Sequence, residues 1–313
     1  MHRIEWHDLP AAARAAVERH TGPVERAETA PHGVMSQLAC TIHTRAGQAF
    51  VKGVPEDDPQ AWVYRHEAQV TRNAPRAPRV LWDVDSGGWR LYGYEYVQGR
   101  YPNLAPGSDD LPPLVDTLTV LSEAAWPETM RKKPLHERWA GFLPDDVPAG
   151  MQGRVLAHTD TSPHNMLVTL GGELLLLDWA LACPAPAWAD TALTIPRLIS
   201  AGHTPAQGEE IARLVPAYSA ADEDTVTIFA RTIFAAWQEW EHTRPLPHRA
   251  ALTDAARKWA TWRESSSTVR TRSSHPTGLR PRRNPCPAPP RRPLPSTGTS
   301  TSPTEVRARS PDP

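Results

Sequence analysis

The chain has 313 residues, of which 40% are hydrophobic and 22% are charged, and its formal net charge is −1. This length allows one large domain or two lobes with a substantial core, and the near-neutral charge excludes the strongly basic surface of a general nucleic-acid binder. The cysteines Cys40, Cys183 and Cys286 are far apart and odd in number, which favours a reducing compartment over a disulfide framework or a zinc site. The N-terminus lacks an apolar signal core and no apolar run reaches membrane-spanning length, so we expect a soluble cytoplasmic protein that does not enter membranes.

The N-terminal part of the sequence predicts a small antiparallel sheet. A helix over residues 8–19, which Asp8 can cap, is followed by strands over residues 24–30, 38–44 and 49–54. Within the last of these strands, alternation places Lys52 on the same face as Phe50 and Val54. A lysine between two apolar neighbours either extends its ammonium group to water or meets a buried anion.

A helix over residues 58–73 supplies a candidate partner for that lysine. Glu67 falls on the apolar stripe of this helix by i, i+4 and i, i+3 spacing. A carboxylate on an apolar stripe and a lysine on an apolar strand face explain each other, so we predict a Lys52–Glu67 ion pair. Taken singly, each residue would fit a solvated edge equally well.

The middle of the chain predicts a hairpin and then mainly helical structure. Strands over residues 80–85 and 90–97 flank a turn that contains two glycines. A helix follows over residues 112–127, with Leu114, Leu118 and Leu121 on its apolar face. The next segment is irregular, with one helical turn expected around residues 136–142.

Residues 155–180 bring two carboxylates and a carboxamide to the ends of neighbouring strands. A short apolar strand delivers the polar loop 158–165, and a predicted hairpin after it ends on Asp178. Asp178 directly follows four leucines, where a carboxylate is costly to bury unless it meets a cation. The loop itself contains Asp160 and Asn165. This spacing suits phosphoryl transfer, in which one Asp accepts the proton of the attacking hydroxyl while Asn and a second Asp hold Mg²⁺.

The remaining sequence predicts helices and then a tail. Helices are expected after Asp190, over residues 207–218, along the apolar stripe from Val226 to Trp240, and over residues 246–262. Residues 265–313 carry nine Arg and two acids, which leaves the rest of the chain at −8, and they are rich in Ser, Thr and Pro. This composition cannot bury enough apolar surface to fold, so we predict a disordered tail. We expect no nucleic-acid partner, because a solvated basic tail needs none.

His158, Asp160 and Asn165, with Asp178 thirteen residues further on, resemble the catalytic and metal loops of the aminoglycoside phosphotransferase family. Members of that family are small-molecule kinases. The resemblance implies an α+β, bilobal protein-kinase-like fold, in which an N-terminal lobe has an antiparallel sheet and one helix and a C-terminal lobe is mainly helical. The implied domains are a nucleotide-binding lobe over residues 1–97, a catalytic and substrate-binding lobe over residues 98–264, and the tail over residues 265–313.

The same resemblance assigns roles to individual residues. Asp160 would be the catalytic residue, and Asn165 and Asp178 would hold Mg²⁺. Lys52, fixed by Glu67, would contact the α- and β-phosphates of ATP, or of GTP as the alternative nucleotide. The remaining nucleotide contacts would come from Gly33, Ser36, the carbonyl of Glu95 and the N–H of Val97. The chain also has no Arg after His158, unlike the H-R-D motif of protein kinases, which favours a small-molecule substrate.

Two positions depart from the family pattern. Thr159 stands where the family commonly has Gly, and because a β-branched residue tolerates fewer backbone conformations, we expect the loop to avoid a glycine-only conformation there. Ala180 stands where the family often has an acidic residue, two positions after the metal Asp, which weakens a second metal contact.

The predicted function is phosphorylation of a hydroxyl on a small molecule, such as an aminoglycoside or another amino sugar or amino alcohol. Acidic residues in the later helices would attract a cationic acceptor: Glu209, Glu210, Glu239 and Glu241. Two other classes stay open. One is a metal-dependent hydrolase with His158, Asp160 and His164 as ligands, and the other is an inactive nucleotide-binding pseudokinase that acts through partners.

Overall fold

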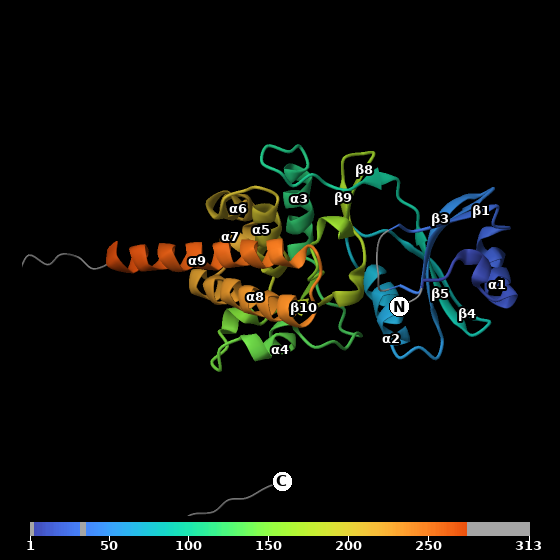
Figure 1. The fold of residues 1–313 in the computed structure, drawn as a ribbon, viewed down its shortest axis with the longest axis horizontal. Coiled ribbons are helices and arrows are strands. Elements are labelled where there is room, and N and C mark those ends of the chain that lie inside the picture. The colour runs from blue at the N-terminus through green and yellow to red at the C-terminus, as the bar shows by residue number, and fades with distance from the viewer. Residues whose placement is uncertain (1–2, 32–35, 274–313) are drawn as a thin grey trace, which may run out of the picture. The chain divides into compact units, whose positions relative to one another are not determined.

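The computed structural model describes residues 3–31 and 36–273, and the chain up to Arg272 groups into one compact unit (Figure 1). Gly33 and Cys286 lie outside the described residues. The predicted tail lies outside them from residue 274 onwards. The predicted α+β fold is confirmed: one part of the unit is built on an antiparallel sheet and the other is mainly helical.

The N-terminal part is organised by a five-stranded antiparallel sheet with the order β1-β2-β3-β5-β4. Its strands are β1 (Arg26–Thr29), β2 (Leu38–Thr44), β3 (Gly47–Pro55), β4 (Val80–Ser86) and β5 (Trp89–Glu95). The central strand β3 pairs with β2 and β5, which places Lys52 opposite Ala39 on one side and Tyr92 on the other.

Side-chain alternation gives this sheet two apolar faces, and a different helix covers each. The first face packs against α1 (Ala11–Thr21) and the preceding 3₁₀ turn η1 (Trp6–Asp8). The second packs against α2 (Ala61–Thr71) through Val54, Tyr64 and Tyr92. Both helices predicted for this part of the chain, over residues 8–19 and 58–73, are therefore present as α1 and α2, because both sheet faces are apolar and each must be covered. Asp8 does not cap α1, since its carboxylate accepts the Glu5 N–H within η1.

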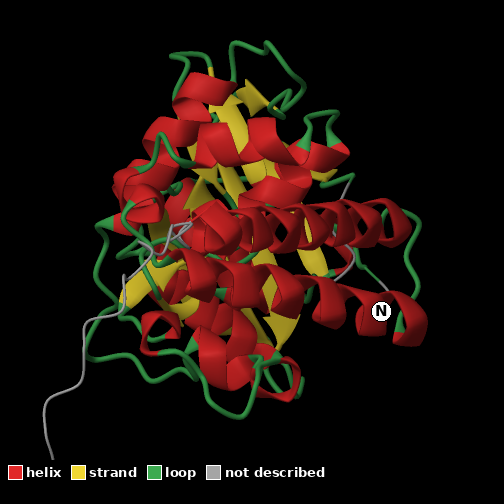
Figure 2. Ribbon diagram, turned by 90° about the vertical axis from the view of Figure 1, so that its left-hand side faces the viewer, coloured by secondary structure: helices red, strands yellow, loops and turns green. Residues whose placement is uncertain are grey.

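The C-terminal part consists mostly of helices, which fill the side of the molecule seen in Figure 2. They are α3 (Leu111–Ser122), α4 (Leu135–Arg138), α5 (Ala189–Ser200), α6 (Pro205–Ala212), α7 (Pro216–Ser219), α8 (Glu223–Thr243) and α9 (Arg249–Ser273). The predicted turn around residues 136–142 is present as α4 and the 3₁₀ turn η2 (Ala140–Phe142), and a further 3₁₀ turn, η3 (Ala149–Met151), follows.

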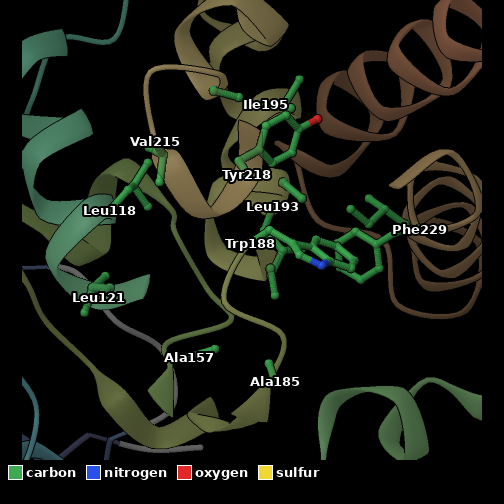
Figure 3. Packing of buried hydrophobic residues seen from close by; sticks show 14 of the residues in the cluster. Leu118, Leu121, Ala157, Ala185, Trp188, Leu193, Ile195, Val215, Tyr218 and Phe229 are labelled. Carbon is green, nitrogen blue, oxygen red and sulfur yellow. The ribbon is translucent and has the colours of Figure 1, made fainter. Parts of the chain in front are cut away.

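One apolar core joins these helices, and Figure 3 shows part of it around Trp188 and Phe229, whose ring centroids are 4.9 Å apart. The predicted apolar faces of α3 and α8 lie in this core, with Leu114, Leu118 and Leu121 buried on α3. Packing of these stripes, rather than the propensity of single residues, accounts for most of the stability of such helices.

Two predicted helices have different ends in the structure. The segment 207–218 is divided into α6 and α7, because Pro216 cannot donate the hydrogen bond that a continuous helix requires and instead occupies the first turn of α7. The last helix continues to Ser273, eleven residues beyond its predicted end at residue 262, and so enters the segment that was expected to be a tail. No helix among the described residues combines the length and apolar character of a membrane span.

Two small sheets hold the polar loop 158–165 in the helical part. β7 (Val155–Ala157) pairs with β10 (Cys183–Ala185). β8 (Met166–Thr169) pairs with β9 (Leu174–Leu176) and with β6 (Gly99–Arg100). The loop thus leaves one sheet at Ala157 and enters the other at Met166. Helix α2 packs against the 3₁₀ turn η5 (Trp179–Leu181), directly after Asp178, and this contact brings the two parts of the unit together at the site.

Candidate active site

His158 holds the start of the loop and is fully buried. Its Nε2 lies 2.8 Å from the Leu177 carbonyl oxygen, to which it donates, and its Nδ1 accepts the Asp160 N–H at 3.2 Å. The ring also lies edge-on against Trp179, with centroids 4.7 Å apart. Both ring nitrogens are therefore occupied in holding the loop, so this histidine orients the backbone and is not placed to carry a proton or ligate a metal.

Thr159 adopts the left-handed backbone conformation, with φ at 65°. The expectation that the loop would avoid such a conformation is wrong. This conformation costs a β-branched residue roughly 1–3 kcal/mol. Three hydrogen bonds of 2.8 Å offset that cost: the Thr159 N–H donates to Asp190, its hydroxyl donates to the Leu181 carbonyl, and Arg138 donates to its hydroxyl oxygen.

The Asp190 carboxylate holds the backbone at the start of the loop. Its Oδ2 accepts the His158 N–H at 2.7 Å and its Oδ1 accepts the Thr159 N–H at 2.8 Å. Burial raises the pKa of Asp190, while its electrostatic interaction with His158 and the two N–H donors oppose that effect. Asp190 lies in the first turn of α5, whose N-cap is Trp188. Its carboxylate accepts hydrogen bonds from the loop and does not cap the helix.

Asp160 lies near the start of the polar loop 158–165, and Asn165 is its last residue. Asn165 Nδ2 donates to the backbone carbonyl of Asp160 at 3.3 Å, so the carboxamide spans the loop. The Asp160 carboxylate is 34% exposed, and its Oδ1 accepts a hydrogen bond from Arg197 Nη2 at 3.2 Å. This leaves the carboxylate both anchored and accessible.

The ion pair predicted between β3 and α2 is present, and Asp178 joins it. Lys52 Nζ lies 2.6 Å from Glu67 Oε1 and 3.4 Å from Asp178 Oδ1. Asp178, two residues after the end of β9, has left-handed backbone angles and is the N-cap of η5. The side chains of Lys52 and Glu67 are 12% and 6% exposed, whereas Asp178 is 48% exposed and can reach a ligand.

The electrostatics keep Lys52 and Asp178 charged near neutral pH. Burial alone would lower the pKa of Lys52, but the carboxylates of Asp178 and Glu67 outweigh it and raise that pKa. The Lys52 ammonium lowers the pKa of Asp178 against the effect of burial. Burial raises the pKa of Glu67 to about 7, although Lys52 opposes the rise. Glu67 is therefore the member of the group whose charge changes in the physiological range.

The raised pKa of Glu67 predicts a pH-dependent stability. Between pH 4.5, the ordinary value, and about 7, the folded chain keeps a proton on Glu67 that the unfolded chain has released. The contribution of this residue to the free energy of unfolding should therefore fall as the pH rises through that window, by on the order of 2–3 kcal/mol, and stay constant above it. Urea denaturation of wild type and Glu67→Gln at pH 4.5, 6 and 8 measures the free energy of unfolding. The variant should lack the pH-dependent contribution of Glu67. A difference between the two proteins that does not change with pH would contradict the assignment.

Three of the other predicted nucleotide contacts lie among the described residues. The backbone carbonyl oxygen of Ser36 accepts a hydrogen bond from Arg3 Nε at 3.2 Å. Glu95 ends β5 and pairs with Arg79 at 2.9 Å, and Val97 lies in the link that follows. Gly33 is outside the described residues. The roles of these four residues stay predictions.

Two arginines at the loop were not found from the sequence. Arg138 donates to the Leu181 carbonyl and to the Thr159 hydroxyl, and Arg197 donates to Asp160. The position of Arg197 could have been predicted from the sequence, because it follows Asp190 by seven residues and so shares its face of the helix. The position of Arg138 could not, since it comes from a segment that was expected to be mostly irregular.

Glu209 does not belong to an acidic surface for a cationic acceptor. It is buried, and its Oε1 accepts from Trp259, Tyr218 and Arg263. The prediction is wrong for this residue because a charged residue in a helix can find a buried partner that is distant in sequence. Glu210 and Glu239 do lie on the surface.

The sequence matches one family model, and the fold matches known structures. Residues 103–246 match the phosphotransferase enzyme family, a range that contains the loop, Asp178 and Asp190 but not Lys52 or Glu67. No curated protein matches the chain.

Three solved structures illustrate the similarity of fold. An aminoglycoside phosphotransferase from Alicyclobacillus acidocaldarius is 17% identical, with a TM-score of 0.56 over 86% of this chain and 98% of that one. The choline kinase LicA from Streptococcus pneumoniae is 13% identical, with a TM-score of 0.55 over 80% and 98%. An aminoglycoside phosphotransferase from Streptomyces rimosus, in complex with ADP and streptomycin, is 17% identical, with a TM-score of 0.51 over 71% and 95%.

Proposed function

We propose, from the match of residues 103–246 to the phosphotransferase enzyme family, that the chain transfers the γ-phosphoryl group of ATP to a hydroxyl of a small molecule with the help of Mg²⁺. The family assignment makes the chain a phosphotransferase. The choice of ATP, the metal and the roles of single residues are the proposal. Residues 1–97 would form the nucleotide-binding lobe and residues 98–264 the catalytic lobe.

The observation that carries the proposal is the meeting of Lys52, Glu67 and Asp178. Strand β3, helix α2 and the residue Asp178 place one buried cation beside two carboxylates, 2.6 and 3.4 Å away. In kinase-like sites such a lysine contacts the α- and β-phosphates and needs its glutamate in place. A structural ion pair would not require a third, half-exposed carboxylate at the end of a catalytic loop.

Asn165 and Asp178 have the chemistry to hold Mg²⁺. Asn165 lies next to Asp178 because its carbonyl accepts the Leu177 N–H at 2.7 Å across the β8–β9 hairpin. Mg²⁺ prefers oxygen ligands and commonly takes one or two from the protein, with phosphates and waters filling the rest. When bound, the ion would neutralise charge on the phosphates. The residues present therefore fit this ion.

Asp160 would act on the acceptor. The hydroxyl oxygen forms a bond to the γ-phosphorus, the bond from that phosphorus to the oxygen bridging the β- and γ-phosphates breaks, and the hydroxyl proton passes to Asp160. ADP leaves with the electron pair of the broken bond. The transition state of such transfers is loose, so correct positioning of the groups supplies most of the rate. Gly33, Ser36, the Glu95 carbonyl and the Val97 N–H would hold the nucleotide, with GTP as the alternative to ATP.

The acceptor would be a small molecule that carries a hydroxyl. The relatives solved with streptomycin and spectinomycin make an amino sugar a reasonable first candidate. Glu210 and Glu239 remain as surface charges that could attract a cation, although Glu209 does not.

Neither alternative class is favoured by a specific contact. A hydrolase built on His158 would need a free ring nitrogen, and both are engaged. Over residues 3–31 and 36–273, no set of three or more His, Cys, Asp or Glu side chains is arranged to hold a metal. A pseudokinase would bind nucleotide without transferring phosphate, and a turnover assay separates it from an active enzyme.

Thermal unfolding of the full chain with ATP and MgCl₂ tests the proposal. A ligand that binds only the folded state raises the melting temperature, by roughly 5 °C or more at 100 times its Kd. We expect this rise only when both components are present, and we expect Asp178→Asn to abolish most of it. The matched control is Asp254→Asn, a change in an exposed ion pair on α9, which should keep the full rise. No shift of the wild type at millimolar ATP and MgCl₂ would count decisively against the proposed function.

A further inference from the structure

Helix α5 contacts the catalytic loop at two points on one face. Asp190, in its first turn, holds the backbone of the loop, and Arg197, seven residues later, reaches the carboxylate of Asp160. Residues seven apart lie on the same side of a helix. The helix therefore fixes both the main chain of the loop and the side chain that would receive the proton.

The guanidinium of Arg197 is held in a single place. Its central carbon lies 5.3 Å from the ring centroid of Trp237 on α8, and its Nη2 lies 3.2 Å from Asp160 Oδ1. An arginine on an aromatic face keeps its planar shape and so directs its donors precisely. Arg197 thus contacts both the ring of Trp237 and the carboxylate of Asp160.

Among the described residues, Arg197 has few polar partners for a buried cation. Its side chain is 14% exposed, and its Nε is buried with no hydrogen-bond partner in the described part of the chain. Burial lowers the pKa of Arg197, and the carboxylate of Asp160 opposes that effect. The buried Arg263 contrasts with it, because that residue has ion pairs with both Glu209 and Glu223. A buried cation with few partners contributes little to stability, and such groups occur most often at functional sites.

We propose that Arg197 is the positioning residue of Asp160. This inference rests on the proposed function and adds a residue to it. Arg197 holds Oδ1, so the carboxylate keeps one orientation. Its Oδ2, which hydrogen-bonds to none of the residues in the described ranges, is then left to accept the hydroxyl proton of the acceptor. Arg197 acts through Asp160 and does not contact the nucleotide.

The test compares Arg197→Lys and Arg197→Gln with wild type in the full chain. The probes are ATP with MgCl₂, and the two measurements are the rate of ADP release with water as acceptor and the Kd of ADP with MgCl₂. We expect Arg197→Gln to lower kcat by about 10–100-fold, the usual effect of misplacing a catalytic group by about 1 Å. Both variants should bind ADP within about twofold of wild type, and Arg197→Lys should recover part of the rate because it keeps the charge. The matched control, Arg231→Gln, changes an arginine that is 60% exposed and pairs with Glu264, and it should hydrolyse ATP like wild type.

The outcomes separate this inference from the proposed function. If the wild type neither binds nor hydrolyses ATP, the proposed function fails first. If the wild type turns over and both Arg197 variants keep its kcat, the positioning role is wrong. The role is also wrong if both variants lose kcat equally and in proportion to a fall in melting temperature, since that is the signature of a purely structural residue. Recovery by lysine at an unchanged ADP affinity supports the role.

Discussion

Replacing Asp160 with asparagine is expected to lower kcat for phosphoryl transfer by about 10²–10⁴-fold, the usual contribution of a positioned general base. Asparagine keeps the shape of the side chain and an oxygen that can still accept from Arg197, so the loop geometry should survive. It cannot take up the hydroxyl proton. The proposed function places the nucleotide at Lys52 and Asp178, so the Kd for ADP with MgCl₂ should change by less than about threefold.

The measurement is the release of ADP at saturating ATP and MgCl₂, with the best acceptor from a panel of aminoglycosides, amino alcohols and macrolides. Asp109→Asn, a change at an exposed position outside the site, is the matched control and should keep the wild-type rate. If Asp160→Asn retains kcat within a factor of two, Asp160 is not the proton acceptor. The loop would then serve only to bind the nucleotide.

The parts of the site that could be predicted from the sequence are those that local periodicity places. Alternation along a strand located Lys52, and i, i+4 spacing located Glu67 on the facing helix. Their contact at 2.6 Å confirms the predicted pairing. Asp160, Asn165 and Asp178 were proposed from a loop and strands that are continuous in sequence, and their roles stay predictions.

The parts that could not be predicted depend on partners distant in sequence. Thr159 was expected to avoid the left-handed region on steric grounds, but Asp190 and Leu181, more than twenty residues away, supply hydrogen bonds that hold it there. Glu209 looked like one more surface carboxylate, because nothing near it in the sequence shows that Arg263 approaches it. Local rules give the conformational preference of a residue, and tertiary contacts decide whether it prevails.

Replacing Arg263 with methionine is expected to reduce the free energy of unfolding by about 3–5 kcal/mol, which is the usual cost of leaving a buried charge without its partner. Arg263 is buried on α9 and forms ion pairs with Glu209 at 2.5 Å and with Glu223 at 2.6 Å, joining α9 to α6 and α8. Its removal leaves the Glu209 carboxylate, 2% exposed, with Trp259, Tyr218 and the partly exposed Arg213 as its partners among the described residues. Urea denaturation at pH 7 measures the loss.

The double variant Arg263→Met/Glu209→Gln shows whether the loss comes from the stranded charge. Glutamine keeps an oxygen that accepts from Trp259 and Tyr218 but carries no charge, so the double variant should be more stable than Arg263→Met alone. Arg231→Met, at an exposed ion pair between α8 and α9, should cost less than about 1 kcal/mol. If the double variant is as unstable as the sum of its two single changes, the contact is ordinary packing. If it recovers, the buried carboxylate requires Arg263, and charge as well as apolar packing ties helix α9 to α6 and α8.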